Sequence, residues 1–83
     1  MEDNKKLIEI CENYLNEKYS IEEFQARLLT ASMNDDIGRI IHALLYDLDT
    51  QLEMIRFSYD EAEHLAKSSK IVYEFLMTVT NVQ

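Results

Sequence analysis

The sequence predicts an all-α protein, a single antiparallel four-helix bundle that spans residues 1–83. It contains one glycine and no proline, a composition that suits long helices with short connections and disfavours a turn-rich β fold. Apolar residues recur at intervals of three and four in four separate blocks, as they do on one face of a helix. Because the connections between the blocks are short, successive helices should pack antiparallel. A chain of this length holds one domain.

The first two blocks predict helices at about residues 4–17 and 21–32. Ser20 can cap the second helix by accepting a hydrogen bond from a free backbone N–H, while Glu23 reaches back to the N–H of the cap residue. The inner stripe of the second helix consists of Ile21, Phe24 and Leu28. The inner stripe of the first helix consists of Leu7, Ile8, Cys11, Tyr14 and Leu15.

The third block, at about residues 36–56, has the most regular apolar spacing and predicts the central helix. In the segment "MNDDIG", Asn34 or Asp35 can cap this helix, and acidic residues there favour the positive end of the helix dipole. Gly38 falls in the first turn, where glycine costs up to ~1 kcal/mol relative to alanine, and we attribute it to close helix packing. The predicted inner residues are Ile37, Ile40, Ile41, Leu44, Leu45, Leu48, Leu52 and Ile55.

The fourth block predicts a helix at about residues 59–80, with Ser58 as its N-cap and Glu61 as the capping-box partner. Its predicted inner residues are Ala62, Leu65, Ala66, Val72, Tyr73, Leu76 and Val79. A neighbouring apolar stripe makes the arc wider than one core face needs; the stripe consists of Ile71, Phe75 and Val82. Two interpretations stay open: the bundle closes over this stripe, or the stripe is apolar surface for a partner.

The charge balance selects the kind of partner. Sixteen acidic and eight basic residues give a formal net charge of −8. Such a surface repels the phosphates of nucleic acids and the headgroups of anionic membranes, so we expect no direct contact with either. The same surface attracts basic proteins and accelerates their association.

Three features predict a cytoplasmic protein. The first residues, "MEDNKK", lack the apolar segment of a secretory signal. No run approaches the ~18 consecutive apolar residues of a membrane span. Cys11 is the one cysteine, so it forms no intramolecular disulfide, and its place on a predicted apolar face suits a reducing compartment.

The sequence predicts neither an enzyme nor a cofactor or metal site. Glu61 and His64 have the E-x-x-H spacing of di-iron bundles, but such sites need two copies of it and a glutamate from each of the other two helices. The inner faces of the other helices supply no glutamate. Cys11 has no histidine in its block and is predicted to be a buried, inert thiol. His42 and His64 are predicted to point outward into solvent, and one glycine cannot form a phosphate-binding loop.

The outer face of the third helix is the candidate recognition surface. At 100° per residue, one arc opposite the core contains Arg39, His42, Tyr46, Asp49, Thr50 and Glu53. An ordinary solvated face explains the charged residues well and Tyr46 poorly, because tyrosine is rigid, amphipathic and enriched in interface hot spots. Acidic residues in the second half of a helix also gain nothing from the helix dipole. Both interpretations stay open.

Three segments resemble the colicin D immunity protein family: "SIEEF", "LLYDLDTQLEMIRF" and "SYDEAEHLAKSSKIVYEFL". The likeness runs from Leu7 to about Leu76. It implies a four-helix bundle in the cytoplasm of a bacterium that makes a nuclease toxin, for example one that cleaves transfer RNA. The bundle would occlude the basic active site of its cognate toxin with acidic residues in place of RNA phosphates. The residues that the resemblance places in this role are Tyr46, Asp47, Asp49, Glu53, Asp60, Glu61 and Glu63.

The predicted function is therefore that of an immunity protein whose partner is a basic nuclease toxin domain. The alternative is a small helical adaptor or regulatory protein that forms a homodimer through the apolar stripe Ile71, Phe75 and Val82 on the fourth helix.

Overall fold

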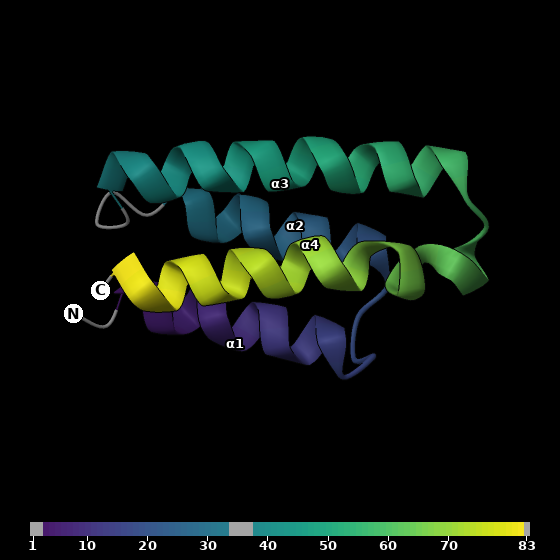
Figure 1. The fold of residues 1–83 in the computed structure, drawn as a ribbon, viewed down its shortest axis with the longest axis horizontal. Coiled ribbons are helices and arrows are strands. Elements are labelled where there is room, and N and C mark those ends of the chain that lie inside the picture. Colours follow the sequence, from purple (N-terminus) through teal and green to yellow (C-terminus); the bar gives the residue numbers. More distant parts are fainter. Residues whose placement is uncertain (1–2, 34–37, 83) are drawn as a thin grey trace.

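The computed structural model describes residues 3–33 and 38–82. These ranges contain no strand and form four helices: α1 (Asp3–Leu15), α2 (Ile21–Ser32), α3 (Gly38–Ser58) and α4 (Glu61–Val82). The helices run alternately up and down, so the start of α1 and the end of α4 lie at the same end of the bundle (Figure 1). The predicted all-α, antiparallel four-helix bundle is confirmed.

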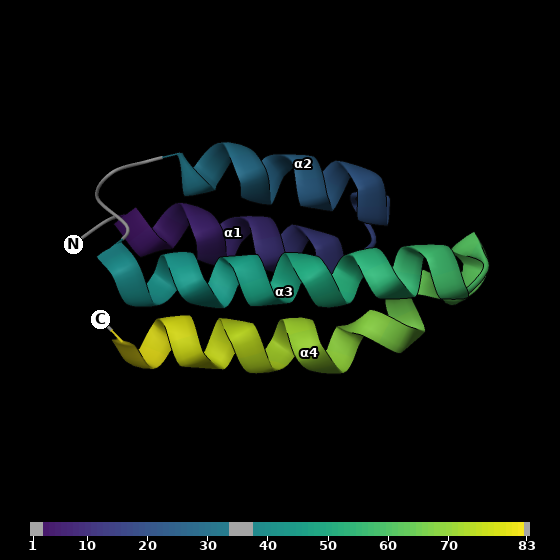
Figure 2. The same ribbon diagram turned by 90° about the horizontal axis from the view of Figure 1, so that it is seen from above.

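The four helices form a square. Each helix packs against the helices before and after it in the sequence, and α4 closes the square against α1. Figures 1 and 2 together show α1 diagonal to α3, and α2 diagonal to α4. The bundle measures 36 × 20 × 18 Å. None of the described helices is both long and apolar enough to cross a membrane.

The core is built from the inner stripes of all four helices. At its centre, the rings of Tyr14 and Phe24 stack with centroids 4.2 Å apart and planes 4° from parallel. Cys11 is fully buried beside them, as predicted. The buried apolar residues are Leu7, Ile10, Cys11, Tyr14, Ile21, Phe24, Leu28, Ile41, Leu45, Leu48, Leu52, Val72, Phe75 and Val79.

Several residues that are predicted to face the core are exposed in the structure, so these predictions are wrong. Ile40 is 65% exposed, because the buried line of α3 runs through Ile41 and the leucines after it, about 100° away around the helix. On α4 the buried line runs through Ser68, Val72, Phe75 and Val79, and this line turns three predicted inner residues toward solvent. The three exposed residues are Ala62, Ala66 and Tyr73.

The wide apolar arc on α4 belongs to the bundle. Phe75 is buried and Ile71 is half-buried against the core, so the bundle closes over these two members of the stripe. The side chain of Val82 lies outside the described part of the chain.

The end of α1 comes at Leu15, two residues before the predicted end. Glu17 adopts a left-handed conformation with φ +66°. The backbone N–H of Glu17 donates to the carbonyl of Tyr14 at 2.9 Å, and the N–H of Lys18 donates to the carbonyl of Asn13 at 2.9 Å. This pair of bonds is a Schellman motif, which satisfies the last free carbonyls of a helix and usually places glycine where Glu17 stands.

The start of α2 matches the prediction, with one difference. The backbone N–H of Glu23 donates to Ser20 Oγ at 3.1 Å, which confirms Ser20 as the N-cap. The Glu23 carboxylate binds Arg27 at 2.8 Å and does not turn back to the N–H of Ser20, because the cation one helical turn later offers a stronger, charge-assisted bond.

The glycine at the start of α3 has a conformational reason. Gly38 has φ +79°, and a Cβ added there would meet no atom within 4 Å. The predicted explanation, close helix packing, is therefore wrong; glycine is suited to this position because it adopts a positive φ without steric cost. The predicted caps Asn34 and Asp35, the predicted helix start and the predicted core residue Ile37 lie outside the described residues.

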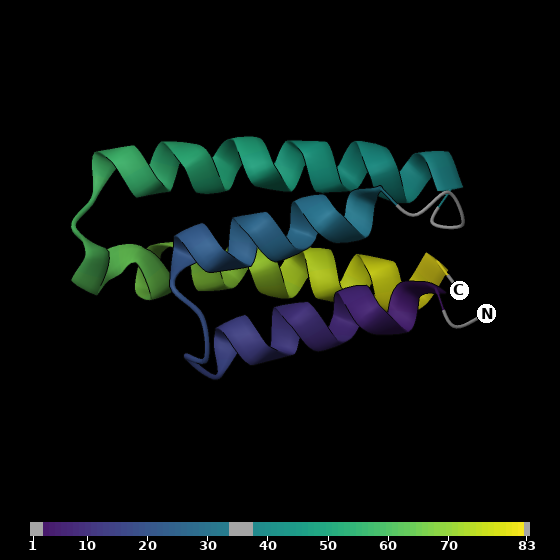
Figure 3. The same ribbon diagram turned by 180° about the vertical axis from the view of Figure 1, so that it is seen from behind.

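The connection between α3 and α4 also differs from the prediction. Ser58 is the last residue of α3 and not the cap of α4, and α4 begins at Glu61. The N–H of Glu63 donates to the backbone carbonyl of Asp60 at 2.8 Å, so Asp60 is the residue that precedes the first turn. Figure 3 shows the short connection at this end of the bundle.

His64 joins the two helices at this connection. Its Nε2 lies 2.9 Å from the carbonyl oxygen of Tyr59 and 3.2 Å from that of Arg56. Carbonyls only accept, so Nε2 carries the hydrogen and donates to the end of α3. The predicted outward, solvated position of His64 is wrong, because the free carbonyls at the end of α3 bind the ring in a half-buried position.

Candidate groove between α2 and α3

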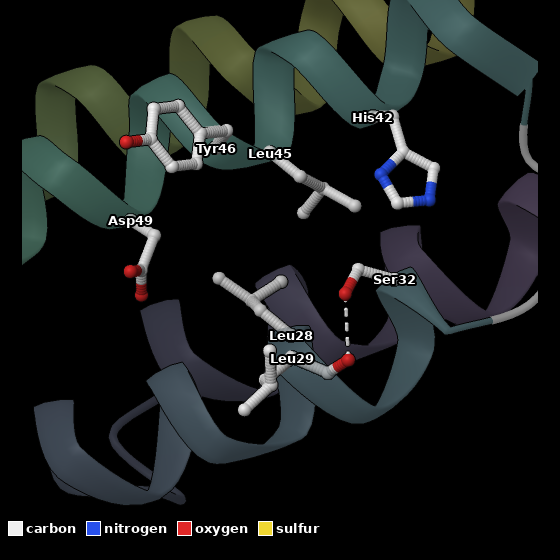
Figure 4. Close-up of a pocket in the computed structure, with 7 residues that line it drawn as sticks. All are labelled: Leu28, Leu29, Ser32, His42, Leu45, Tyr46 and Asp49. Carbon is white, nitrogen blue, oxygen red and sulfur yellow. Dashed lines mark hydrogen bonds between the residues drawn. The ribbon is translucent and has the colours of Figure 1, made fainter.

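A groove of about 250 Å³ lies between the second half of α2 and the first half of α3. Figure 4 shows leucines from the two helices facing each other, with His42 and Asp49 on either side of them. The groove is lined by Leu28, Leu29, Ser32, His42, Leu45, Tyr46 and Asp49.

The groove has an apolar floor and an apolar rim. Leu28 and Leu45 form the floor and are buried core residues. Leu29 is 62% exposed and Tyr46 is 77% exposed at the rim. The predicted outward position of Tyr46 is confirmed, and the structure adds a leucine from the neighbouring helix. Two large apolar side chains beside an apolar floor are a typical arrangement for receiving part of a partner.

A buried amide holds two carboxylates at one end of the groove. Gln25 is only 8% exposed, and its Nε2 donates to Asp49 Oδ1 at 3.1 Å and to Glu53 Oε1 at 3.2 Å. Its Oε1 accepts from Arg56 Nη1 at 3.4 Å, and Arg56 Nη2 lies 2.9 Å from Glu22. All hydrogen-bonding atoms of this amide are therefore used.

Neither carboxylate forms a direct salt bridge within the described residues, and Arg56 is bonded to the other end of the Gln25 amide. The salt bridges within the described residues join Arg27 to Glu23 and Arg56 to Glu22, and neither involves Asp49 or Glu53. Carboxylates four residues apart on a helix repel each other by a few tenths of a kcal/mol, and the neutral amide of Gln25 offsets part of this cost. The arrangement holds two carboxylates side by side that bind a neutral amide and form no direct salt bridge within the described residues.

Asp47 does not join this group. It lies toward α4, in a shallow hollow between α3 and α4, and its Oδ2 accepts from Gln51 Nε2 at 3.0 Å. One step of 100° around the helix separates Asp47 from Tyr46, which places the two side chains toward different neighbouring helices.

The second predicted acidic group lies near the opposite end of α3 from the groove. Asp60, Glu61 and Glu63 are exposed at the start of α4, where negative charge favours the helix dipole. Tyr46 is twelve residues before the end of α3, which corresponds to roughly 18 Å along the helix axis. The structure therefore brings Tyr46, Asp49 and Glu53 onto one face of α3 and places the second group on another helix, away from Tyr46.

Two observations bear on the chemistry of the described residues. Within residues 3–33 and 38–82, no group of three or more His, Cys, Asp or Glu side chains is placed to hold a metal ion. Burial, with a smaller contribution from the charge of Glu12, raises the pKa of the Cys11 thiol to about 12. Cys11 therefore stays protonated at neutral pH, and a protonated thiol is a poor nucleophile.

Sequence reasoning missed Gln25, Leu29 and Ser32. The burial of Gln25 could have been predicted, because positions 21, 24, 25 and 28 share one helical face. A polar residue among apolar ones on that face needs a hydrogen-bonding partner. The sequence gives no indication that Leu29 and Ser32 line a groove, because their role depends on how α2 packs against α3.

The sequence matches no family model, and it has no significant match among curated proteins or among solved structures. The resemblance to colicin D immunity proteins thus rests on the quoted segments alone and stays a prediction.

Proposed function

We propose that this protein is an immunity protein, which binds and inhibits a cognate nuclease toxin of the bacteriocin type in the cytoplasm of the bacterium that makes the toxin. The observation that carries the proposal is the surface formed by Tyr46, Asp49 and Glu53. A rigid, 77%-exposed tyrosine stands there beside two carboxylates that form no direct salt bridge within the described residues.

The physics of inhibition fits this surface. A nuclease binds phosphates with lysine and arginine, so its active-site cleft is basic. A protein with a net charge of −8 is attracted to such a cleft, and opposite charge accelerates association. Inhibition requires no catalytic residue; it requires carboxylates placed in advance, because a partner that is already ordered loses less entropy on binding.

The first step of the test determines whether the preceding reading frame encodes a large secreted protein with a basic C-terminal domain, and such a domain then serves as the nuclease in the assays. Cells that express this domain should survive with the wild-type chain and die with the double variant Asp49→Lys, Glu53→Lys. The milder variant Asp49→Asn, Glu53→Gln keeps both oxygen acceptors for Gln25, and it should slow association at low salt by removing two charges.

The matched control is Glu9→Lys, Glu12→Lys, which makes the same charge change at exposed positions of α1, diagonal to α3. The control should protect cells as the wild type does, and circular dichroism should show the same helix content for all variants. Equal protection by the Asp49, Glu53 lysine variant would place the binding surface elsewhere. A wild-type chain that neither binds the domain nor protects cells would overturn the proposed function.

The alternative, a self-associating adaptor, has lost part of its predicted surface, because Phe75 is buried and Ile71 is half-buried. Sedimentation over a range of concentrations tests it, and a monomer at high micromolar concentration would remove it.

A further inference from the structure

The groove between α2 and α3 combines two kinds of surface that meet at Asp49. This residue lines the groove beside the leucine floor, and it also accepts from Gln25, which holds Glu53 at the same time. The apolar surface and the pair of carboxylates are thus one continuous site, and Figure 4 shows Asp49 beside the leucines.

The apolar part is large enough for a side chain. An enclosed apolar cavity of ~150 Å³ accepts benzene, and the groove has about 250 Å³. A leucine, methionine or phenylalanine can therefore enter it. Leu29 and Tyr46, which are exposed at the rim, would lose contact with water when such a side chain enters, and this loss favours binding.

The two carboxylates determine which group of the partner can lie next to that apolar side chain. Gln25 fixes an oxygen of Asp49 and an oxygen of Glu53 within 3.1–3.2 Å of one nitrogen, which leaves the remaining carboxylate oxygens free to accept from a partner. A guanidinium presents several N–H donors in one plane and suits paired carboxylates better than an ammonium does.

We propose that the groove receives an apolar side chain of a partner protein while an adjacent arginine binds Asp49 and Glu53, and that Gln25 is the positioning residue for these two carboxylates. The inference rests on the proposed function only for the identity of the partner, a basic nuclease. It adds that charge alone does not bring about binding, because the partner must carry an apolar anchor beside its cation.

The first experiment separates the apolar contact from the charge. Leu29→Glu makes the rim more acidic, so a purely electrostatic surface would bind the basic nuclease domain equally well or more tightly. The proposed groove predicts at least a tenfold loss of affinity, mainly through faster dissociation. The matched control is Met77→Glu on α4, which adds the same charge at a similarly exposed apolar residue, 54% against 62%. It should change the affinity less than twofold.

Unchanged or tighter binding by Leu29→Glu would overturn the groove proposal and leave the proposed function standing. To test the groove independently of the proposed function, a probe is needed that does not depend on the toxin. N-acetyl-Leu-Arg-amide, titrated at millimolar concentration into ¹⁵N-labelled protein, should shift amide signals within residues 28–32 and 42–53. The same peptide with citrulline in place of arginine should bind more weakly, because citrulline carries no charge.

Two variants complete the test with the peptides. Leu29→Glu should abolish the localised shifts, and Gln25→Met should lower the ratio of arginine-peptide to citrulline-peptide affinity while the fold is retained. A merely structural role of Gln25 would weaken both peptides equally. Shifts that are absent or spread over the whole bundle would overturn the groove proposal, whatever the nuclease domain does. Localised shifts without binding of that domain would support the groove and contradict the proposed function.

Discussion

Removing the buried hydroxyl pair Tyr14–Ser68 one group at a time should cost unequal amounts of stability. Tyr14 Oη lies 2.7 Å from Ser68 Oγ, and Ser68 Oγ lies 2.7 Å from the carbonyl oxygen of His64. A carbonyl only accepts, so the one serine hydrogen goes to His64. Tyr14 must therefore donate its own hydrogen to Ser68.

The magnitudes follow from which polar group is left without a partner. Tyr14→Phe removes one donor and leaves the serine bond to His64 intact, which should cost about 0.5–1.5 kcal/mol. Ser68→Ala leaves the buried Tyr14 hydroxyl without a hydrogen-bond partner and should cost about 1–3 kcal/mol. The higher helix propensity of alanine should offset ~0.5 kcal/mol of this cost. The double variant leaves no hydroxyl without a partner, so its loss of stability should be about 1 kcal/mol smaller than the sum of the losses in the single variants.

Urea unfolding, followed by circular dichroism at the helix band, measures these differences by linear extrapolation. The total stability expected for a domain of this size is roughly 4–12 kcal/mol, so each change is a measurable fraction of it. Costs that add to within ~0.3 kcal/mol, or a larger cost for Tyr14→Phe than for Ser68→Ala, would refute the assigned direction of the hydrogen bond.

The same pair has a pH signature. Burial raises the pKa of Tyr14 above its usual 10.0, and the hydrogen bond with Ser68 lowers it by a smaller amount. A pKa raised in the folded state means that the stability contribution is complete below pH 10 and is lost as the pH rises through the folded value. Wild-type stability should therefore fall relative to Tyr14→Phe above about pH 10.

Three further changes test other parts of the fold. Glu17→Gly should raise the free energy of unfolding by about 0.5–1 kcal/mol in urea titrations, because glycine adopts φ +66° without strain. Cys11 has its pKa raised from 9.0 to about 12, so its contribution is complete below pH 9 and is lost toward pH 12. At pH 10 the loss should be on the order of 1 kcal/mol, and the fall in stability with pH should be shallower in Cys11→Ala. Leu52→Ala should cost about 2–5 kcal/mol at a fully buried site and lower the melting temperature by ~10 °C or more.

Each of these predictions has a control on the same chain. Glu17→Gln removes the charge and keeps the strained Cβ, so a gain equal to that of Glu17→Gly would contradict the conformational explanation. An equal pH dependence in Cys11→Ala and wild type would contradict the thiol assignment. Met54 is exposed on the same helix as Leu52, and Met54→Ala should cost less than ~0.5 kcal/mol; similar costs for the two alanine variants would contradict the position of the core.

The helices and most of their inner faces could be predicted from apolar spacing, because a helix buries residues at fixed intervals whatever it packs against. The inner stripe Ile21, Phe24 and Leu28 was confirmed in this way. The buried polar residues could not be found by the same count. Gln25 forms a hydrogen bond with Asp49, 24 residues away, and Ser68 forms one with Tyr14, 54 residues away. A local sequence pattern does not contain these long-range hydrogen bonds.

The start of α4 shows a second limit. The segment "SYDEAE" contains two overlapping capping signals, one from Ser58 to Glu61 and one from Asp60 to Glu63. Local chemistry permits both. The structure excludes the first because α3 continues through Ser58, and in α4 the N–H of Glu63 donates to the backbone carbonyl of Asp60.

The candidate site was predicted in part. The outward positions of Tyr46 and Glu53 followed from helical geometry and are confirmed. The groove beside them could not be predicted, because Leu29 comes from another helix and lines the same groove as Tyr46 only through the packing of α2 on α3.

The floor and the rim of the groove have different relations to the rest of the molecule. Leu28 and Leu45 belong to the core, whereas Leu29 and Tyr46 face water and hold no helix in place. Replacing the two rim residues should therefore leave the assembly of the bundle nearly unchanged. Mutation can then alter the chemistry of the rim without first weakening the bundle, so one architecture can present many different surfaces.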